Sequence, residues 1–310
     1  MKTRHPARPL TNMLADVTDI VRLLREAEAY LIERGVPNAR RNAEWLLGHV
    51  LECRTPDIYL SPYRVLERSE RDLFRSMLRR RGEREPLQYI LGSTEFMSLP
   101  FDMRRGVFIP RPDTELLVEK VETLLSGIAL GSGNEDTGGR LTVLDLCCGA
   151  GVIGISLAAR RGDLECVAVD VDGGAVVLTR DNAARSGVGD RVRCVEANAA
   201  DFLRGRPGTY HAVVCNPPYV PAVEIDDLLP EVRDHEPRLA LDGGADGLDF
   251  YREVIPLLPD VVARGGIIAL EIGDTQGRAV CALVEASAFC GTTVHKDYGN
   301  LDRVVTGRKP

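Results

Sequence analysis

Two short segments hold the residue types best suited to chemistry, and the first is a glycine-rich loop at residues 147–154. Gly149, Gly151 and Gly154 follow an apolar run in the pattern G-x-G-x-x-G. Glycines at these places let the backbone turn sharply and approach a bound nucleotide closely. Asp170 ends the next apolar run, 19 residues after Gly151, where a carboxylate can accept hydrogen bonds from ribose hydroxyls. The loop therefore predicts a cofactor with a ribose, which both NAD and S-adenosylmethionine contain.

The choice between these cofactors depends on a carboxylate and on a second segment. Asp145 lies four residues before Gly149, and its charge would repel a pyrophosphate but attract the ammonium or sulfonium group of S-adenosylmethionine. The second segment has the sequence Asn-Pro-Pro-Tyr at 216–219 and follows the apolar run 210–215. In open α/β sheets, ligands bind at the carboxyl ends of the strands. Both features favour a methyltransferase over an NAD-dependent enzyme.

The second segment suits an amino group whose lone pair is delocalised. The side-chain oxygen of Asn216 can accept one N–H of a planar NH2 group, and the carbonyl of Pro217 can accept the other. Both contacts strengthen as the nitrogen gains positive charge, so they stabilise the transition state selectively. Tyr219 offers a ring on which a planar group can stack. The motif alone leaves adenine, cytosine and glutamine open as substrates.

Apolar residues at helical spacing predict a small all-helical unit over residues 14–85. Trp45 is expected inside its core, and the basic stretch 75–84 is expected to be the solvated end of a helix. Residues 87–109 then change to short β-like runs broken by glycine and proline, which indicates a hairpin linker.

After residue 110 apolar runs alternate with helical stretches, which predicts a parallel sheet covered by helices on both faces. The predicted strands are 141–146, 165–171, 191–197, 210–215 and 266–272. Two last strands, at 292–298 and 302–307, are joined by three residues only and must pair antiparallel. The segment 127–139 is expected to be a flexible surface connection.

Composition excludes several classes of protein. The chain has 310 residues and a net charge of −7, a length typical of about two domains. Residues 1–110 carry 19 basic and 15 acidic side chains, whereas residues 111–310 carry 20 and 31, which argues weakly against DNA as a partner. No apolar run is long enough to span a membrane, and no apolar stretch near residue 1 could serve as a secretory signal. The eight cysteines have no metal-ligand spacing, so we expect reduced, mostly buried thiols, no metal and a cytoplasmic protein.

The chain resembles the HemK-type peptide chain release factor glutamine N5-methyltransferases over nearly its whole length. The residues that carry this resemblance are 88–92 (QYILG), 108–115 (FIPRPDTE), 145–151 (DLCCGAG), 216–219 (NPPY) and 297–305 (DYGNLDRVV). The element PRPDTE ahead of the glycine loop is the specific part. The resemblance implies a Rossmann-like class I S-adenosylmethionine-dependent methyltransferase sheet with an antiparallel C-terminal hairpin, preceded by a small all-helical domain. The implied divisions are a substrate-recognition domain at 1–86, a β-hairpin linker at 87–110 and a methyltransferase domain at 111–310.

The resemblance further implies methylation of the glutamine in the Gly-Gly-Gln loop of bacterial class 1 release factors. The cofactor would be bound by Asp145, Cys147, Cys148, Gly149, Ala150, Gly151, Asp170, Asp201, Phe202 and Asn216, with Phe202 flanking the adenine. The substrate would contact Phe108, Arg111, Glu115, Asn216, Pro217, Pro218 and Tyr219, of which Asn216, Pro217 and Tyr219 would be catalytic. We expect a monomer that needs no metal, membrane or nucleic acid.

Three alternatives remain open at this point. Arg111 and Glu115 also suit the start of a helix, because acidic residues there face the positive end of the helix dipole. Glu271 can be read simply as the end of a strand. A ribosomal-protein glutamine methyltransferase would use the same site, and a DNA or RNA amino-methyltransferase is a more distant possibility.

Overall fold

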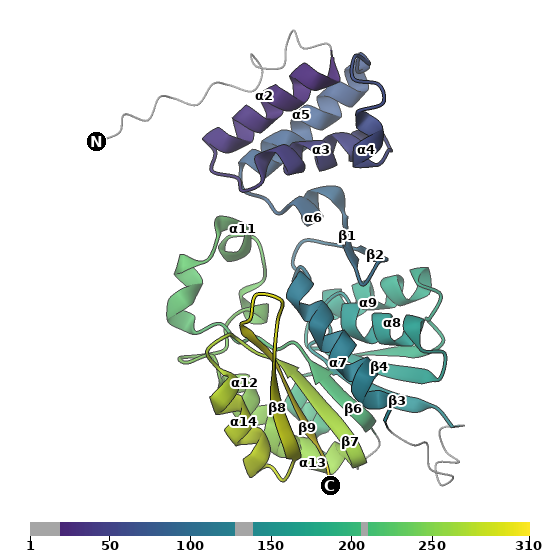
Figure 1. Cartoon of the computed structure of the whole chain (residues 1–310), viewed down its shortest axis with the longest axis vertical. Helices are drawn as coiled ribbons and strands as arrows, with labels where there is room; N and C mark the ends of the chain where they lie inside the picture. Colours follow the sequence, from purple (N-terminus) through teal and green to yellow (C-terminus); the bar gives the residue numbers. More distant parts are fainter. Residues whose placement is uncertain (1–18, 128–138, 206–209) are drawn as a thin grey trace. The chain divides into compact units, whose positions relative to one another are not determined.

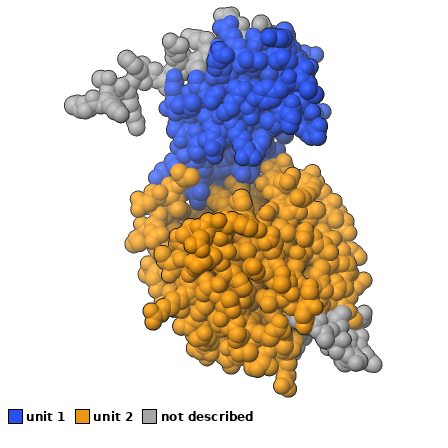
Figure 2. Space-filling view, viewed as in Figure 1, with its two compact units in different colours: residues 1–92, 230–235 blue, residues 93–229, 236–310 orange. Residues whose placement is uncertain are grey.

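The computed structural model describes residues 19–127, 139–205 and 210–310, which fall into two compact units (Figures 1 and 2). The smaller unit combines residues up to Gly92 with Pro230–His235, and the larger unit contains Ser93–Leu229 and Glu236–Pro310. The surface connection predicted at 127–139 lies, apart from its two end residues, outside the described residues. The domain limits predicted from the sequence stay predictions.

The smaller unit is helical. Its helices are α2 (Ile20–Glu33), α3 (Ala39–Val50), α4 (Thr55–Ile58), α5 (Arg68–Gly82), α6 (Leu87–Leu91) and α11 (Pro230–Arg233). Its core contains apolar side chains of α2, α3 and α5, such as Leu24, Leu47 and Phe74, none of which is exposed. Burial of such side chains, each stabilising by about 1.5–3 kcal/mol, holds the helices together.

Two predictions about this unit are wrong. Trp45 is 39% exposed with Arg41 over its ring, because the buried face of α3 is set by Ala43, Leu46 and Leu47 on the other side of the helix. In the basic stretch, Arg81 is only 4% exposed rather than solvated. Its guanidinium donates to Asn42 Oδ1 at 2.7 Å and to Glu231 Oε1 at 2.7 Å, so a buried cation is fully paired.

A β-hairpin opens the larger unit. Strands β1 (Ser93–Phe96) and β2 (Leu99–Asp102) pair antiparallel through a two-residue turn. The hairpin is fastened by Asn182, whose Oδ1 accepts from the Asp102 N–H at 2.8 Å and whose Nδ2 donates to the Asp102 carbonyl at 3.2 Å. The same Nδ2 donates to the carbonyl of Ala150 in the glycine loop at 3.0 Å. The hairpin therefore lies within the predicted linker, whose first residues form helix α6 instead.

The sheet of the larger unit has seven strands in the order β5-β4-β3-β6-β7-β9-β8. They are β3 (Leu141–Leu146), β4 (Leu164–Asp170), β5 (Val192–Glu196), β6 (Tyr210–Cys215), β7 (Val262–Glu271), β8 (Cys290–Lys296) and β9 (Asp302–Arg308). The first five strands of this order are parallel, and β9 runs antiparallel between β7 and β8. The predicted α/β architecture with an antiparallel C-terminal hairpin is confirmed. The strand order reverses between β3 and β6, the place where open α/β sheets bind ligands.

Helices cover both faces of this sheet (Figure 1). One face packs against α7 (Glu115–Leu125), α8 (Val152–Arg160) and α9 (Gly173–Arg185), and the other against α10 (Ala199–Leu203), α12 (Asp249–Val254), α13 (Leu258–Val261) and α14 (Gly277–Ala286). Short 3₁₀ helices occupy Pro112–Thr114, Ala222–Asp227, Arg238–Ala240 and Ile255–Leu257. In the described part of the chain, no helix has the length and apolarity needed to cross a membrane.

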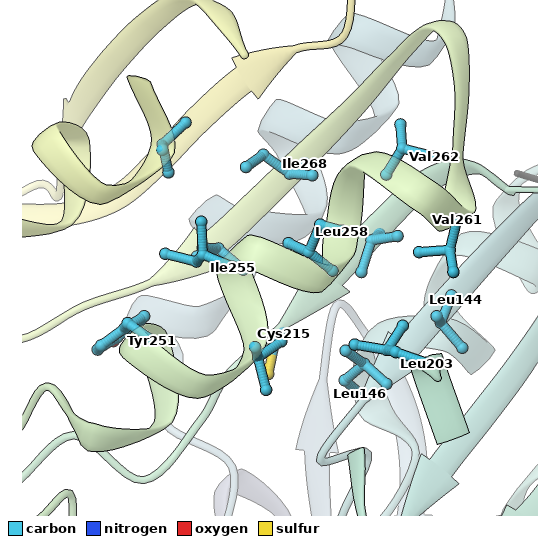
Figure 3. Close-up of a cluster of buried hydrophobic side chains, with 14 of the residues drawn as sticks. Leu144, Leu146, Leu203, Cys215, Tyr251, Ile255, Leu258, Val261, Val262 and Ile268 are labelled. Carbon is cyan, nitrogen blue, oxygen red and sulfur yellow. The ribbon is translucent and has the colours of Figure 1, made fainter. Parts of the chain in front are cut away.

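The main core lies between the sheet and the helices of its second face. Figure 3 shows members of this core, with Cys215 of β6 near Ile255 of the covering helices and with Leu144 and Leu146 of β3 near Leu203. All eight cysteines are free. Cys148, Cys166 and Cys215 are buried as expected, but the prediction is wrong for the other five: Cys290 on the outer strand β8 is exposed, and Cys53, Cys147, Cys194 and Cys281 are only half-buried. A rigid core directly beneath the ends of β3 and β6 holds these ends in place.

Candidate functional site

The glycine loop follows β3 and leads into α8. Cys147, Gly149 and Gly151 have φ angles of 56°, 55° and 80°, a left-handed conformation that glycine adopts at no steric cost. A Cβ atom added at Gly151 would lie 2.6 Å from Thr179 Cγ2, whereas one added at Gly149 would meet nothing within 4 Å. Gly151 therefore serves close packing, and Gly149 borders open space in which a ligand can approach the backbone.

Asp145, the penultimate residue of β3, is fully buried beneath this loop. Its Oδ2 accepts a hydrogen bond from the Gly154 N–H at 2.9 Å, while Oδ1 has no hydrogen-bond partner among the described residues. Burial raises the pKa of this carboxyl to about 7, and the nearby charge of Asp170 adds to the shift. A cation in the site would compensate the cost of ionising Asp145.

Asp170, at the end of β4, is tied to the same loop. Its Oδ2 accepts from the Gly149 N–H at 2.8 Å, and its Oδ1 accepts from the Asp172 N–H at 3.0 Å. Burial raises the pKa of Asp170. Each oxygen keeps a second lone pair, so the carboxylate can still accept a hydrogen bond from a hydroxyl of a ligand.

The two other predicted cofactor residues are differently placed. Asp201 is exposed and pairs with Arg204, the residue that follows the same short helix. The ring of Phe202 is only 5% exposed and lies in the main core. Phe202 can therefore support a planar ligand with only a small part of its surface, and its contact with adenine stays a prediction.

The Asn-Pro-Pro-Tyr segment follows β6, the next strand beside β3. Asn216 Nδ2 donates to the hydroxyl oxygen of Thr114 at 3.2 Å, which leaves Oδ1 as the end of the amide that can accept from a ligand. Pro217 is buried and Pro218 half-buried. The segment thus presents a fixed side-chain acceptor next to the glycine loop at the switch point of the sheet.

Tyr219 closes this segment. Its hydroxyl donates to Glu271 Oε1 at 3.3 Å, and its carbonyl accepts from Gln276 Nε2 at 2.8 Å. Burial raises the pKa of Tyr219, with the charge of Glu271 as the next cause. The tyrosine is therefore neutral at physiological pH.

The segment that leads into α7 and the first residue of α7 supply the other predicted substrate residues, and the structure gives them internal partners. Arg111 lies over the ring of Phe108 at 4.7 Å and pairs with the buried Glu236 at 2.6 Å. Glu115 Oε1 accepts from the Met97 N–H in the hairpin turn at 2.7 Å. Arg111 thus holds the segment ahead of α7, and Glu115 holds the hairpin turn. The contact of both residues with substrate stays a prediction.

Two residues of the site, Thr114 and Glu271, were not among the predicted site residues, and Glu271 was interpreted only as the end of a strand. Glu271 ends β7 and is 1% exposed. Burial raises the pKa of its carboxyl to about 7, and the Thr114 hydroxyl and the charge of Arg303 oppose this shift. The position of Glu271 between the apolar Leu270 and Ile272 could have indicated a functional residue. Burying a charge in an apolar run costs free energy unless the charge is paired or hydrogen-bonded.

The residues of the loop fit S-adenosylmethionine. Open space at Gly149, the unpartnered Oδ1 of Asp145 and the spare lone pairs of Asp170 match a ligand with a cationic end and ribose hydroxyls. Across the described ranges, no group of His, Cys, Asp or Glu side chains could hold a metal ion.

Two family models match the chain. The PrmC N-terminal domain matches residues 22–92, and the methyltransferase small domain matches residues 113–232.

Similar curated proteins carry the name release factor glutamine methyltransferase. The one from Geobacter sulfurreducens is 37% identical over 94% of this chain and 98% of its own length. The one from Chlorobaculum tepidum is 36% identical, covering 93% and 96%. Among solved structures, a methyltransferase from Pyrococcus furiosus aligns with a TM-score of 0.46 at 16% identity, covering 69% of this chain and 90% of that one.

Proposed function

Because this chain belongs to the family of release factor glutamine methyltransferases, we propose that it methylates the side-chain nitrogen of the glutamine in the Gly-Gly-Gln loop of bacterial class 1 release factors. S-adenosylmethionine, when bound, supplies an electrophilic methyl group. The strand order and the matched methyltransferase small domain agree with the predicted class I methyltransferase fold. Asp145, Gly149, Gly151 and Asp170 are the residues that would hold this cofactor.

The observation that carries the proposal is the orientation of Asn216. With Nδ2 bonded to Thr114, Oδ1 can accept one N–H of the glutamine amide, and the Pro217 carbonyl can accept the other. The two contacts turn the nitrogen lone pair toward the methyl group, and they strengthen as the nitrogen becomes positive. Bound S-adenosylmethionine would give its methyl group to this nitrogen and leave as S-adenosylhomocysteine, and the nitrogen would release a proton to water. No strong base is needed, because the methylated nitrogen is acidic.

The cellular location and the partners of the enzyme follow from its proposed substrate. Release factors act in translation, so we place the enzyme in the cytoplasm. The acidic balance of residues 111–310 supports a protein substrate without a nucleic-acid partner, since duplex binding needs a basic surface. We expect a monomer, which sedimentation of the purified protein would test.

Purified enzyme, tritiated cofactor and a class 1 release factor test the proposal. We expect label in the release factor, and none when the glutamine of its Gly-Gly-Gln loop is replaced by alanine. Ribosomal proteins in the same assay test the alternative substrate. Label that does not depend on that glutamine, or that appears only in ribosomal proteins, would overturn the proposed substrate.

A further inference from the structure

A set of contacts reaches from the catalytic segment to a carboxylate on another strand. Asn216 Nδ2 donates to Thr114 Oγ1 at 3.2 Å. Thr114 is 1% exposed, and its hydroxyl lies beside Glu271, where it lowers the pKa of that carboxyl. The elements involved are the 3₁₀ helix before α7, the end of β6 and the end of β7.

The single hydrogen of the Thr114 hydroxyl decides which of these groups donates and which accepts. A threonine hydroxyl has one hydrogen, and its oxygen already accepts from Asn216. Its hydrogen must therefore point to another acceptor. Glu271, whose carboxyl lies beside the Thr114 hydroxyl, has one buried oxygen, Oε2, without a hydrogen-bond partner in the described residues, and it is therefore the acceptor that this hydrogen can satisfy.

The carboxyl of Glu271 is itself held in place. Tyr219 donates to its other oxygen at 3.3 Å, and Tyr251 donates to the backbone carbonyl of Glu271 at 2.6 Å. The side chain has no solvent into which it could turn. The charges of Arg303 and Asp113 act on its pKa in opposite directions, Arg303 lowering it and Asp113 raising it.

We propose that Glu271 is a positioning residue: through the Thr114 hydroxyl it holds the Asn216 amide with Nδ2 turned inward and Oδ1 turned to the substrate amide. The inference rests on the proposed function, in which Asn216 binds the glutamine nitrogen. An amide can be flipped by 180° with little change in shape. A flipped Asn216 would present N–H donors to the N–H donors of the substrate, so only one orientation supports the reaction.

The first test removes the hydroxyl. Thr114→Val keeps the shape of the side chain, and we expect kcat to fall roughly 10- to 100-fold while the affinity for S-adenosylhomocysteine stays within about threefold. Thr114→Ser keeps the hydroxyl and should recover most of kcat. Thr306→Val is the matched control, since Thr306 is also buried and its hydroxyl bonds to His295 instead; its kcat should equal that of the wild type.

A double-mutant cycle tests the contribution of Glu271. If both residues act through one path, Thr114→Val and Glu271→Gln together should lower kcat no more than the stronger single change. Multiplicative losses would show two independent roles and would overturn the inference.

The contacts from Glu271 through Thr114 to Asn216, here called the relay, can be tested by nuclear magnetic resonance without measuring enzyme turnover. In protein labelled with ¹⁵N-asparagine and bound to S-adenosylhomocysteine, the side-chain signal that disappears in Asn216→Ala belongs to Asn216. That signal should move in Thr114→Val and Glu271→Gln but not in Thr114→Ser or Thr306→Val. An unmoved signal in Thr114→Val would refute the relay, whereas absent methylation of release factor by the wild type would refute the proposed function and leave this measurement valid.

Discussion

The ends of β3 and β7 flank β6 on either side, and each carries one buried carboxyl. Asp145 and Glu271 are 0% and 1% exposed, and burial raises the pKa of each to about 7. Each also has one oxygen without a hydrogen-bond partner in the described residues. Their partners differ: Asp145 accepts from the backbone of the glycine loop, while Glu271 accepts from the side chain of Tyr219.

This difference indicates that the carboxyls of Asp145 and Glu271, on the two sides of β6, have different roles. Asp145 acts on the loop that would hold the cofactor, and Glu271 acts on side chains that would hold the substrate nitrogen. Similar burial and a similarly raised pKa therefore do not imply equal roles, because the role is set by the group that each carboxyl orients.

The largest effect is expected at Asn216, which directly follows β6, the strand between the two carboxyls. Asn216→Ala removes the acceptor for the substrate N–H, and we expect kcat to fall about 100- to 1000-fold, as for loss of one transition-state hydrogen bond. The affinity for S-adenosylhomocysteine, measured by calorimetry, should change less than about threefold. Unchanged turnover would refute the amide-holding mechanism.

Neutral substitutions should separate the two carboxyls. Asp145→Asn should weaken binding of the cationic cofactor about 10-fold or more with little change in kcat at saturation. Glu271→Gln should lower kcat about 10-fold and leave cofactor affinity nearly unchanged. Steady-state kinetics and calorimetry on both variants give the comparison, and identical profiles would abolish the distinction between the two strand ends.

The stability of the cofactor-free protein should fall as pH rises toward 7. A carboxyl whose folded pKa is about 7 against an ordinary value of 3.8 for Asp145 or 4.5 for Glu271 binds more protons when folded. Its contribution is therefore complete below about pH 4 and is lost as pH rises through about 7. Between pH 5.5 and 7 the loss is about 2 kcal/mol for each group. Urea unfolding at both pH values should show this loss, and Asp145→Asn and Glu271→Gln should each reduce it; a slope equal to that of the wild type would contradict the shift.

The smallest effect is expected at Tyr219. Its hydrogen bond to Glu271 is long, at 3.3 Å, so Tyr219→Phe should lower kcat less than about fivefold. The ring remains available for stacking, and Tyr219→Ala should therefore lower kcat further. Equal losses in both variants would assign the role to the hydroxyl.

The fold could be predicted because its signals are local. Alternation of apolar runs and helical stretches gave the parallel sheet, and the three-residue connection before β9 gave its antiparallel end. The burial of side chains in the helical unit was harder to predict from the sequence. The predicted exposure of Trp45 and of Arg81 was wrong, because it depends on which face of each helix packs against its neighbours.

The site was predicted to the extent that its residues are contiguous. The glycine loop and residues 216–219 each stand directly after a strand, where position and chemistry coincide. Thr114 lies 102 residues from Asn216 along the chain, and no periodicity relates them. Only folding brings the element before α7 to the ends of β6 and β7.

The bonds of Asn182 give the molecule a further property. One side chain is bonded both to the β1–β2 hairpin through Asp102 and to the glycine loop through Ala150. A restriction on the motion of one segment therefore also restricts the motion of the other, and this coupling is reciprocal. A ligand that restricts the motion of the loop also lowers the conformational entropy of the hairpin, although it does not contact the hairpin. The hairpin then loses less conformational entropy when it binds a partner.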